Sequence, residues 1–406
     1  MQNRLNRRQM FQSLGGAAAC LAYARPGWAA EAPTAAVAVA KCPDYGSELL
    51  PALARMFDQL GGLGKLVKGK TVAIKLNLAG DPSYRLGYTL PGEAQWVHPN
   101  AIAAVVHLMG RAGARRIRLL EAPRSSAAPL EEHFLAGNCD PREFVSAAPG
   151  VEFENTNYLG RAKKYSRMAV PDGGLMFKAF DLNHSYEDCD VFVSMTKLKE
   201  HITAGITVSI KNLLGITPCT IYGTESGVDE PSLLPRGGRD PFHDGRRQPS
   251  KGSPPENDPT SPRDAGYRIP RIVADLAAAR PIHLAIADGI ATMTAAEGPW
   301  QRGGSRTCMA VRPGVLIAGT NPVTTDAVGA AVMSFDPMAD RGAPPFETCD
   351  NTLRFAEQHG LGTRDLRRIE VIGTPITEVR FNFRAHWKTP ASGPAAALRP
   401  APALPL

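Results

Sequence analysis

The residues best suited to chemistry lie close together in one segment of the chain, 191–215. An apolar run, 191–195, leads directly into lysines, a histidine and an asparagine. Ligands bind at the carboxyl ends of strands in α/β proteins, and clustered ammonium groups are costly there unless an anion neutralises them. The segment therefore predicts an anion or cofactor site made by Lys197, Lys199, His201, Lys211 and Asn212.

Further polar residues fall on a predicted strand and at a predicted helix start. Lys75 and Asn77 share one face of the strand 71–79, where both would need partners if buried. His98 precedes Pro99 at a helix start, where backbone N–H groups attract anions. A solvent-facing edge strand and a simple helix cap are the structural alternatives.

Carboxylates and an amide follow the later strands in the same way. Asp288 comes directly after the apolar run 282–287, with Glu297 nine residues further on. Such carboxylates can act as bases, orient His201 or bind a cation. Asn321 and Asp326 lie at the start of a predicted helix. The structural alternatives to ligand binding are a helix cap and a carboxylate that complements the helix dipole. Recurrence at successive strand ends predicts one composite site, with His201 as general base at a pKa near working pH.

Strand and helix patterns alternate along most of the chain, which is typical of a parallel sheet. We predict an α/β fold of doubly wound type: a layered, mostly parallel sheet with helices on both faces. Segment 205–214 is ambiguous, because its alternating β-branched residues also fit a strand. The predicted strands are 71–79, 116–120, 190–195, 282–287, 314–318 and 368–372, and the predicted helices are 99–112, 129–135, 205–214, 269–279, 323–333 and 351–358.

Composition divides the chain into parts. The α/β region 31–386 is interrupted by 217–266, which is rich in Pro, Gly, Arg and Asp and leaves 40–216 and 267–375 as candidate subdomains. A loop this long is usually a lid, a partner surface or a disordered segment. The Ala/Pro-rich tail 387–406 is predicted to be disordered.

Residues 1–30 are typical of an export signal. Arg7 and Arg8 precede an apolar stretch, which resembles the twin-arginine type, and Cys20 ends a weak lipid-attachment box. We predict a periplasmic protein. A Sec signal and a cytosolic amphipathic start are the alternatives.

Composition also limits the partners. The net charge of +7 comes largely from the first thirty residues, and no basic stripe with interleaved aromatics suggests nucleic acid. No later apolar run is long enough to span a membrane. The cysteines after the signal lack metal-ligand spacings, so no iron–sulfur or zinc site is predicted, and their pairing is unreadable. We expect a small anionic ligand and, through 217–266, a partner protein.

Taken together, these segments resemble the ordered motifs of the DUF362 family over roughly residues 70 to 375. The matching motifs are Lys75-Leu-Asn77, His98-Pro99, Lys197-Leu-Lys199-Glu-His201, Lys211-Asn212-Leu-Leu-Gly215, Asp288-Gly289, Glu297-Gly298-Pro299 and Asn321-Pro-Val-Thr-Thr-Asp326. The family is largely uncharacterised, so the resemblance implies a fold and a site more than a reaction. Some relatives carry a ferredoxin-like segment, which is missing here.

His201 to Lys211 is also similar to the His-x-x-Ala-Gly…Lys element of the LarA-like (lactate racemase) superfamily. That resemblance implies a catalytic histidine and a lysine tethered to a nickel-pincer nucleotide. The glycine pair expected before the lysine is replaced by Val208 and Ser209, and no nickel-ligating histidine follows soon. The nickel cofactor is therefore only remotely implied, and the cofactor and any metal stay unknown.

Two function classes remain open. One is an exported enzyme, an oxidoreductase or isomerase, that acts on a small anion or uses a phosphate-bearing cofactor. The other is a non-catalytic periplasmic protein for ligand binding, cofactor maturation or partner recognition.

Overall fold

A computed structural model describes residues 32–300 and 308–387. The predicted signal and most of the predicted tail lie outside these residues. The elements of the fold belong to the compact unit that begins at Pro33. The six cysteines described in it are free thiols.

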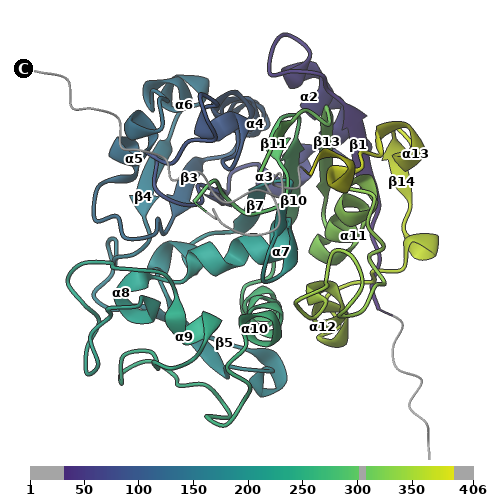
Figure 1. The fold of residues 1–406 in the computed structure, drawn as a ribbon. Coiled ribbons are helices and arrows are strands. Elements are labelled where there is room, and N and C mark those ends of the chain that lie inside the picture. Colours follow the sequence, from purple (N-terminus) through teal and green to yellow (C-terminus); the bar gives the residue numbers. More distant parts are fainter. Residues whose placement is uncertain (1–31, 301–307, 388–406) are drawn as a thin grey trace, which may run out of the picture. The chain divides into compact units, whose positions relative to one another are not determined.

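One eight-stranded sheet carries the fold (Figure 1). Strand β13 runs antiparallel to both of its neighbours, β1 and β10, while the other adjacent pairs are parallel. The prediction of an α/β fold with a mostly parallel sheet is confirmed. The strand order is β14 (Val371–Gly373), β1 (Val37–Lys41), β13 (Val315–Gly319), β10 (Leu284–Gly289), β7 (Val191–Lys197), β2 (Thr71–Lys75), β3 (Arg116–Glu121) and β4 (Val151–Asn155).

Helices cover both faces of this sheet, as predicted. Neighbouring residues of β10 point to opposite faces, so Ala285 and Ala287 join one apolar cluster while Leu284 and Ile286 join the other. Such two-sided burial explains why the strands are almost continuously apolar. The first cluster includes α7 (Ser209–Asn212), α10 (Ala265–Ala279), α11 (Pro322–Val332) and α12 (Thr352–Gln358); the second includes α2 (Leu49–Gln59), α3 (Leu63–Val67), α4 (Pro99–Arg111), α5 (Leu130–Ala136) and α6 (Arg142–Ala147).

Three small two-stranded sheets and several short helices complete the described part. The hairpin β8–β9 follows β7 directly and brings two predicted site residues back toward the sheet. These elements are β5 (Ser166–Ala169) with β6 (Ala179–Leu182), β8 (Lys199–His201) with β9 (Gly205–Thr207), β11 (Thr292–Met293) with β12 (Ala310–Val311), and the helices α8 (Cys219–Tyr222), α9 (Asp240–His243) and α13 (Ile376–Val379). Single 3-10 turns occupy Pro91–Glu93, Pro171–Gly173, His184–Tyr186, Leu213–Ile216, Leu366–Arg368 and Phe383–His386.

The prediction of one helix over 205–214 is wrong. Its first three residues form β9, and only Ser209–Asn212 are α-helical, followed by a 3-10 turn. Gly205 has a φ of +73°, which suits glycine and starts the return strand of the hairpin. The alternating β-branched residues therefore indicated a strand, and the short helix α7 begins only after them.

The insertion 217–266 packs against the rest of the unit. Its few aromatic residues are buried, with the rings of Tyr222 and Phe242 stacked 4.8 Å apart between centroids. Arg268 on α10 is fully buried and bonds Glu256 and the carbonyl of Pro241 in the insertion. The sequence suggested little to bury here, but these contacts fix the segment to the core.

Candidate functional site

A cavity of about 160 Å³ lies where β2 and β3 end, beside the β8–β9 hairpin and α7. Residues from distant parts of the chain meet in its wall, including three from the insertion. Its lining carries five cationic side chains, two carboxylates and two histidines: Lys75, Lys199, Lys211, Arg124, Arg239, Glu121, Glu297, His201 and His243.

One side of the cavity is a hydrogen-bonded network around Lys75. The Lys75 Nζ lies 2.8 Å from Glu121 Oε1 and donates to Asn212 Oδ1 at 3.1 Å. Asn77 donates to the same Asn212 oxygen at 3.1 Å. Gly215 makes room for the pair, because a Cβ there would lie 2.6 Å from the Lys75 Nζ. Lys75 is thus neutralised by Glu121, and Asn212 holds the two strand-end residues together.

Lys199 and Lys211 are buried without such a partner. The Lys199 Nζ donates to two backbone carbonyls, those of Gln95 and Glu297, each at 2.8 Å. Within residues 32–300 and 308–387, no hydrogen bond or ion pair involves the Lys211 Nζ. Burial lowers the pKa of Lys199 to about 7 and that of Lys211 to about 8, although the nearby Glu297 opposes both shifts.

His201 faces the cavity as a neutral donor. Its Nδ1 accepts the backbone N–H of Thr203 at 3.1 Å, so the ring proton of the neutral form sits on Nε2. Burial, then Lys211 and Lys199, lower its pKa well below the ordinary value of 6.5. The expectation of a pKa near working pH therefore does not fit this environment, and in the neutral form the Nε2–H can donate a hydrogen bond.

The short helix α7, which carries Lys211, is held by a carboxylate from α11. Asp326 accepts the backbone N–H groups of Ser209 and Ile210, both at 2.9 Å. Burial raises the pKa of Asp326 to about 7, against these hydrogen bonds. Asp326 is outside the cavity lining, so its place is behind the helix rather than against a ligand.

Four charged or titratable residues of the cavity lining were missed by the sequence reasoning: Glu121, Arg124, Arg239 and His243. Glu121 is the last residue of β3, so the strand-end rule could have found it. Arg239 lies in the insertion, where no periodic pattern locates a residue. Its Nε and Nη2 donate to carbonyl and hydroxyl oxygens of Thr217 and Ala122, and no carboxylate among the described residues pairs with it.

Buried Lys197 and Asp288 form a separate cluster with the partly exposed His98, outside the cavity lining. The Lys197 Nζ bonds Asp288 Oδ2 at 2.6 Å, the Tyr45 hydroxyl at 2.9 Å and two backbone carbonyls. His98 caps α4 through Nδ1 and stacks on the Tyr45 ring, 3.6 Å between centroids. Asp288 was expected to orient His201. The structure corrects this, because the Asp288 carboxylate instead bonds Lys197, the Tyr45 hydroxyl and the His98 backbone N–H.

Asn321 likewise lies outside the cavity lining. Its Oδ1 accepts the backbone N–H groups of Val323 and Thr324, at 3.0 and 3.1 Å, which caps α11. Glu297 does line the cavity, and burial raises its pKa. The structure thus brings seven of the predicted residues to one cavity: Lys75, Asn77, Lys199, His201, Lys211, Asn212 and Glu297.

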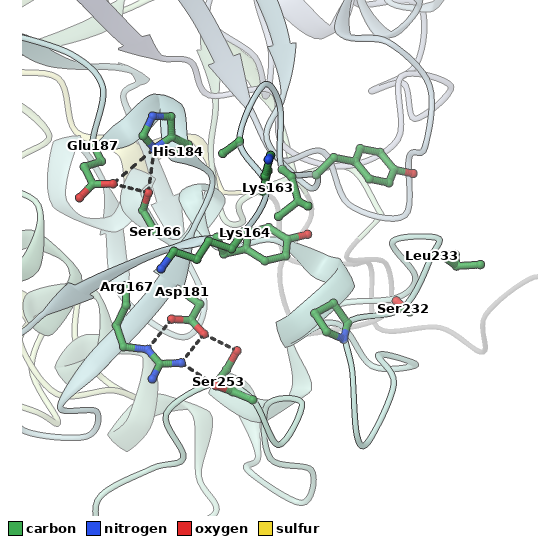
Figure 2. A pocket seen from close by; sticks show the side chains of 16 residues that line it. Lys163, Lys164, Ser166, Arg167, Asp181, His184, Glu187, Ser232, Leu233 and Ser253 are labelled. Atoms are coloured by element: carbon green, nitrogen blue, oxygen red, sulfur yellow. Dashed lines mark hydrogen bonds and ion pairs between the residues drawn. The ribbon is translucent and has the colours of Figure 1, made fainter.

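A second, larger depression of about 1140 Å³ lies between residues 158–167, β6 and the insertion. Figure 2 shows that its acidic groups already have partners. Asp181 pairs with Arg167 at 2.8 Å and accepts from Ser253 at 2.7 Å, while Glu187 lies 3.3 Å from His184.

The same groove presents cations and an apolar side chain to solvent. Lys163 and Lys164 are exposed, and neither makes an ion pair with any described residue. Leu233, from the insertion, is 91% exposed at the rim. The groove is therefore positively charged with an apolar edge.

The described residues do not fit a nickel-pincer nucleotide. They contain no group of three or more His, Cys, Asp or Glu side chains able to hold a metal ion. The cavity of about 160 Å³ is also far smaller than the roughly 300–1,000 Å³ of sites for larger ligands.

Among the described residues, no helix is both long and apolar enough to cross a membrane.

The proteins similar to this chain include a curated relative and two solved structures. A thylakoid-associated protein of Synechocystis sp. is 27% identical over 171 residues, 42% of this chain and 46% of that protein. A structural-genomics protein from Thermotoga maritima has a TM-score of 0.32 at 13% identity, over 61% of this chain and 50% of that one. The lactate racemase apoprotein from Thermoanaerobacterium thermosaccharolyticum has a TM-score of 0.30 at 10% identity, over 65% and 51%.

This chain thus spans about half the length of each of these proteins. The family model described as "Domain of unknown function (DUF362)" matches residues 72–331, which is more than half of the chain. The resemblance seen in the ordered motifs is therefore confirmed, and the chain belongs to the DUF362 family.

Proposed function

We propose that the cavity binds a small carboxylate- or phosphate-bearing molecule, and that the protein is an enzyme of the isomerase or oxidoreductase type acting on it. The observation that carries this proposal is the meeting of Lys199, Lys211 and Arg239 at one cavity without carboxylate partners among the described residues. Burying a charge without a partner is strongly unfavourable, and a bound anion would offset that cost.

The dimensions of the cavity limit the ligand. A volume of about 160 Å³ corresponds to roughly five water molecules at ~30 Å³ each. This favours an inorganic oxyanion or an organic acid of a few heavy atoms over a nucleotide.

The surrounding groups could move protons on such a ligand. A bound anion would favour the charged forms of Lys199 and Lys211, so it would raise their pKa values. Lys211, with its pKa lowered to about 8, can exchange a proton near neutral pH. The Nε2–H of His201 would donate to developing negative charge. Proton transfer next to a carboxylate is the reaction class this set favours.

Calorimetry with phosphate, sulfate, oxalate and acetate tests the site. We expect binding that weakens at least ~10-fold in Lys211→Met, since the change removes one buried charge at constant side-chain length. Lys178→Met is the matched control, because Lys178 is exposed and away from the cavity. Equal affinity in wild type and Lys211→Met would rule out the proposed site.

The alternative is a non-catalytic protein that binds a partner through the groove of Figure 2. The exposed Lys163, Lys164 and Leu233 favour it, since a charged groove with an apolar edge suits an acidic segment of another protein. Changing both lysines to Glu should abolish partner binding and spare anion binding. If Lys211→Met abolishes activity while changing Lys163 and Lys164 to Glu alters neither activity nor partner binding, the proposal that the protein is an enzyme holds.

We further propose that the protein is exported to the periplasm by the twin-arginine route. Arg7 and Arg8 ahead of an apolar stretch support this. Fusing residues 1–30 to a reporter that folds before export would test it. Export should stop when both arginines are changed to Lys, and continued export would favour the Sec route instead.

A further inference from the structure

We infer that Lys211 attacks the carbonyl carbon of a small aldehyde or keto acid bound in the cavity and forms an imine with it. This inference rests on the proposed anion site and goes beyond it, because it names a carbonyl group as part of the ligand and Lys211 as the nucleophile.

The placement of the Lys211 amine is the first argument. The side chain is only 9% exposed and lines the cavity, yet no described residue accepts a hydrogen bond from its Nζ. Its helix is fixed from behind by Asp326 through the Ser209 and Ile210 N–H groups. An amine on an anchored helix that no described residue engages is free to meet an electrophile.

The other buried lysines are engaged in ways that leave Lys211 as the best candidate. Lys75 pairs with Glu121, and Lys197 pairs with Asp288 while also meeting three other oxygens. Lys199 donates to two backbone carbonyls, which it would have to leave before attack.

The protonation state supports the geometry. Burial, with Arg239 and Lys75 acting in the same direction, lowers the pKa of Lys211 to about 8 against the opposing effect of Glu297. Before the carboxylate of the ligand enters the cavity, about one tenth of the amine is unprotonated at neutral pH, roughly 300-fold more than at the ordinary value of 10.5. Desolvation beside other cations is a known route to a nucleophilic lysine.

Arg239 is the group best placed to hold the acid end of the ligand. Its Nε and Nη2 are anchored to Thr217 and Ala122, and no described residue accepts from its Nη1. The guanidinium stays charged at any relevant pH, so it can anchor a carboxylate while Lys211 is neutral.

The step balances without a further reactant. The nitrogen lone pair forms the C–N bond as the C=O π electrons move to oxygen, giving a carbinolamine. The two amine hydrogens leave with that oxygen as water, and the nitrogen forms the C=N bond. No oxidant or reductant is consumed, and water hydrolyses the imine in reverse.

Trapping with sodium borohydride tests the inference. The full-length protein is incubated near neutral pH with glyoxylate or pyruvate, reduced, digested and analysed by mass spectrometry. We expect a reduced adduct on Lys211 in preference to every exposed lysine, by at least ~10-fold given its larger unprotonated fraction. Oxalate should compete, and Lys178→Met should be trapped like the wild type.

Two different substitutions of Lys211 are used, so that the test still gives an answer if one variant folds poorly. Lys211→Met and Lys211→Arg should both lose the adduct while circular dichroism stays like that of the wild type. An adduct spread evenly over exposed lysines, or none at all, overturns the imine. If oxalate and phosphate still bind by calorimetry in that case, the anion site stands and only the imine fails; if they do not bind, both proposals fail.

Discussion

Replacing Lys211 by Met should stabilise the protein, which is an unusual outcome for a buried site. Burial lowers the pKa of Lys211 from 10.5 to about 8, and each pKa unit corresponds to about 1.4 kcal/mol. The charged amine therefore costs the folded state up to about 3 kcal/mol. The Lys211 charge also stabilises the buried Glu297 carboxylate, and the variant loses that interaction. We therefore expect the free energy of unfolding of Lys211→Met to exceed that of the wild type by about 1–3 kcal/mol at neutral pH.

The pH dependence gives the sharper test. Because the pKa is lower in the folded protein, the unfolded chain binds more protons between about pH 8 and 10.5. Stability of the wild type should rise through that interval. Below it, Lys211 is protonated in both states and the full penalty is present. The advantage of Lys211→Met should therefore be constant below about pH 8 and vanish near pH 10.5.

Urea unfolding followed by tryptophan fluorescence, at several pH values, measures this difference. The control Lys178→Met should stay within about 0.5 kcal/mol of the wild type, as exposed substitutions do. A saturating anion should stabilise the wild type more than Lys211→Met, since only the former binds it well. A Lys211→Met protein that is less stable than the wild type at neutral pH would refute the reasoning, as would a gain that persists at high pH.

Other predictions concern the same cavity. Glu121→Gln should destabilise the fold by about 3–5 kcal/mol in urea unfolding, because it leaves the Lys75 ammonium buried without its partner. Arg239→Met should weaken phosphate or oxalate binding at least ~10-fold by calorimetry while circular dichroism is unchanged. Affinity for these anions should fall as pH rises through about 7 and then about 8, where the ligand-free protein loses protons from Lys199 and Lys211. An affinity that is flat across this range would contradict the last prediction.

The strand-end rule predicted much of the site from the sequence. It placed Lys75, Asn77 and the cluster after β7 correctly at the carboxyl edge of the sheet, where the cavity lies. It could not say which of them share a cavity. Lys197 and Lys199 are two residues apart, yet the chain turns into the β8–β9 hairpin between them, so they meet different partners.

The parts that sequence patterns missed have physical reasons. Arg239 sits in a segment without apolar periodicity, and its position depends on a few long-range contacts such as the buried Arg268 with Glu256. The strand β1 is only five residues long, and its antiparallel pairing with β13 leaves no mark on the residues themselves. Pairing of distant strands is decided by the whole core rather than by local preference.

The buried lysines themselves argue for where the chemistry lies. Four of them are nine-tenths or more buried: Lys75, Lys197, Lys199 and Lys211. Glu121 and Asp288 neutralise the first two, which is how folded proteins usually tolerate a buried charge. The other two share one cavity with Arg239 and form no ion pair with a carboxylate among the described residues. A protein built only for stability would gain by replacing them with apolar residues, so their cost is best explained by an anion that binds between them.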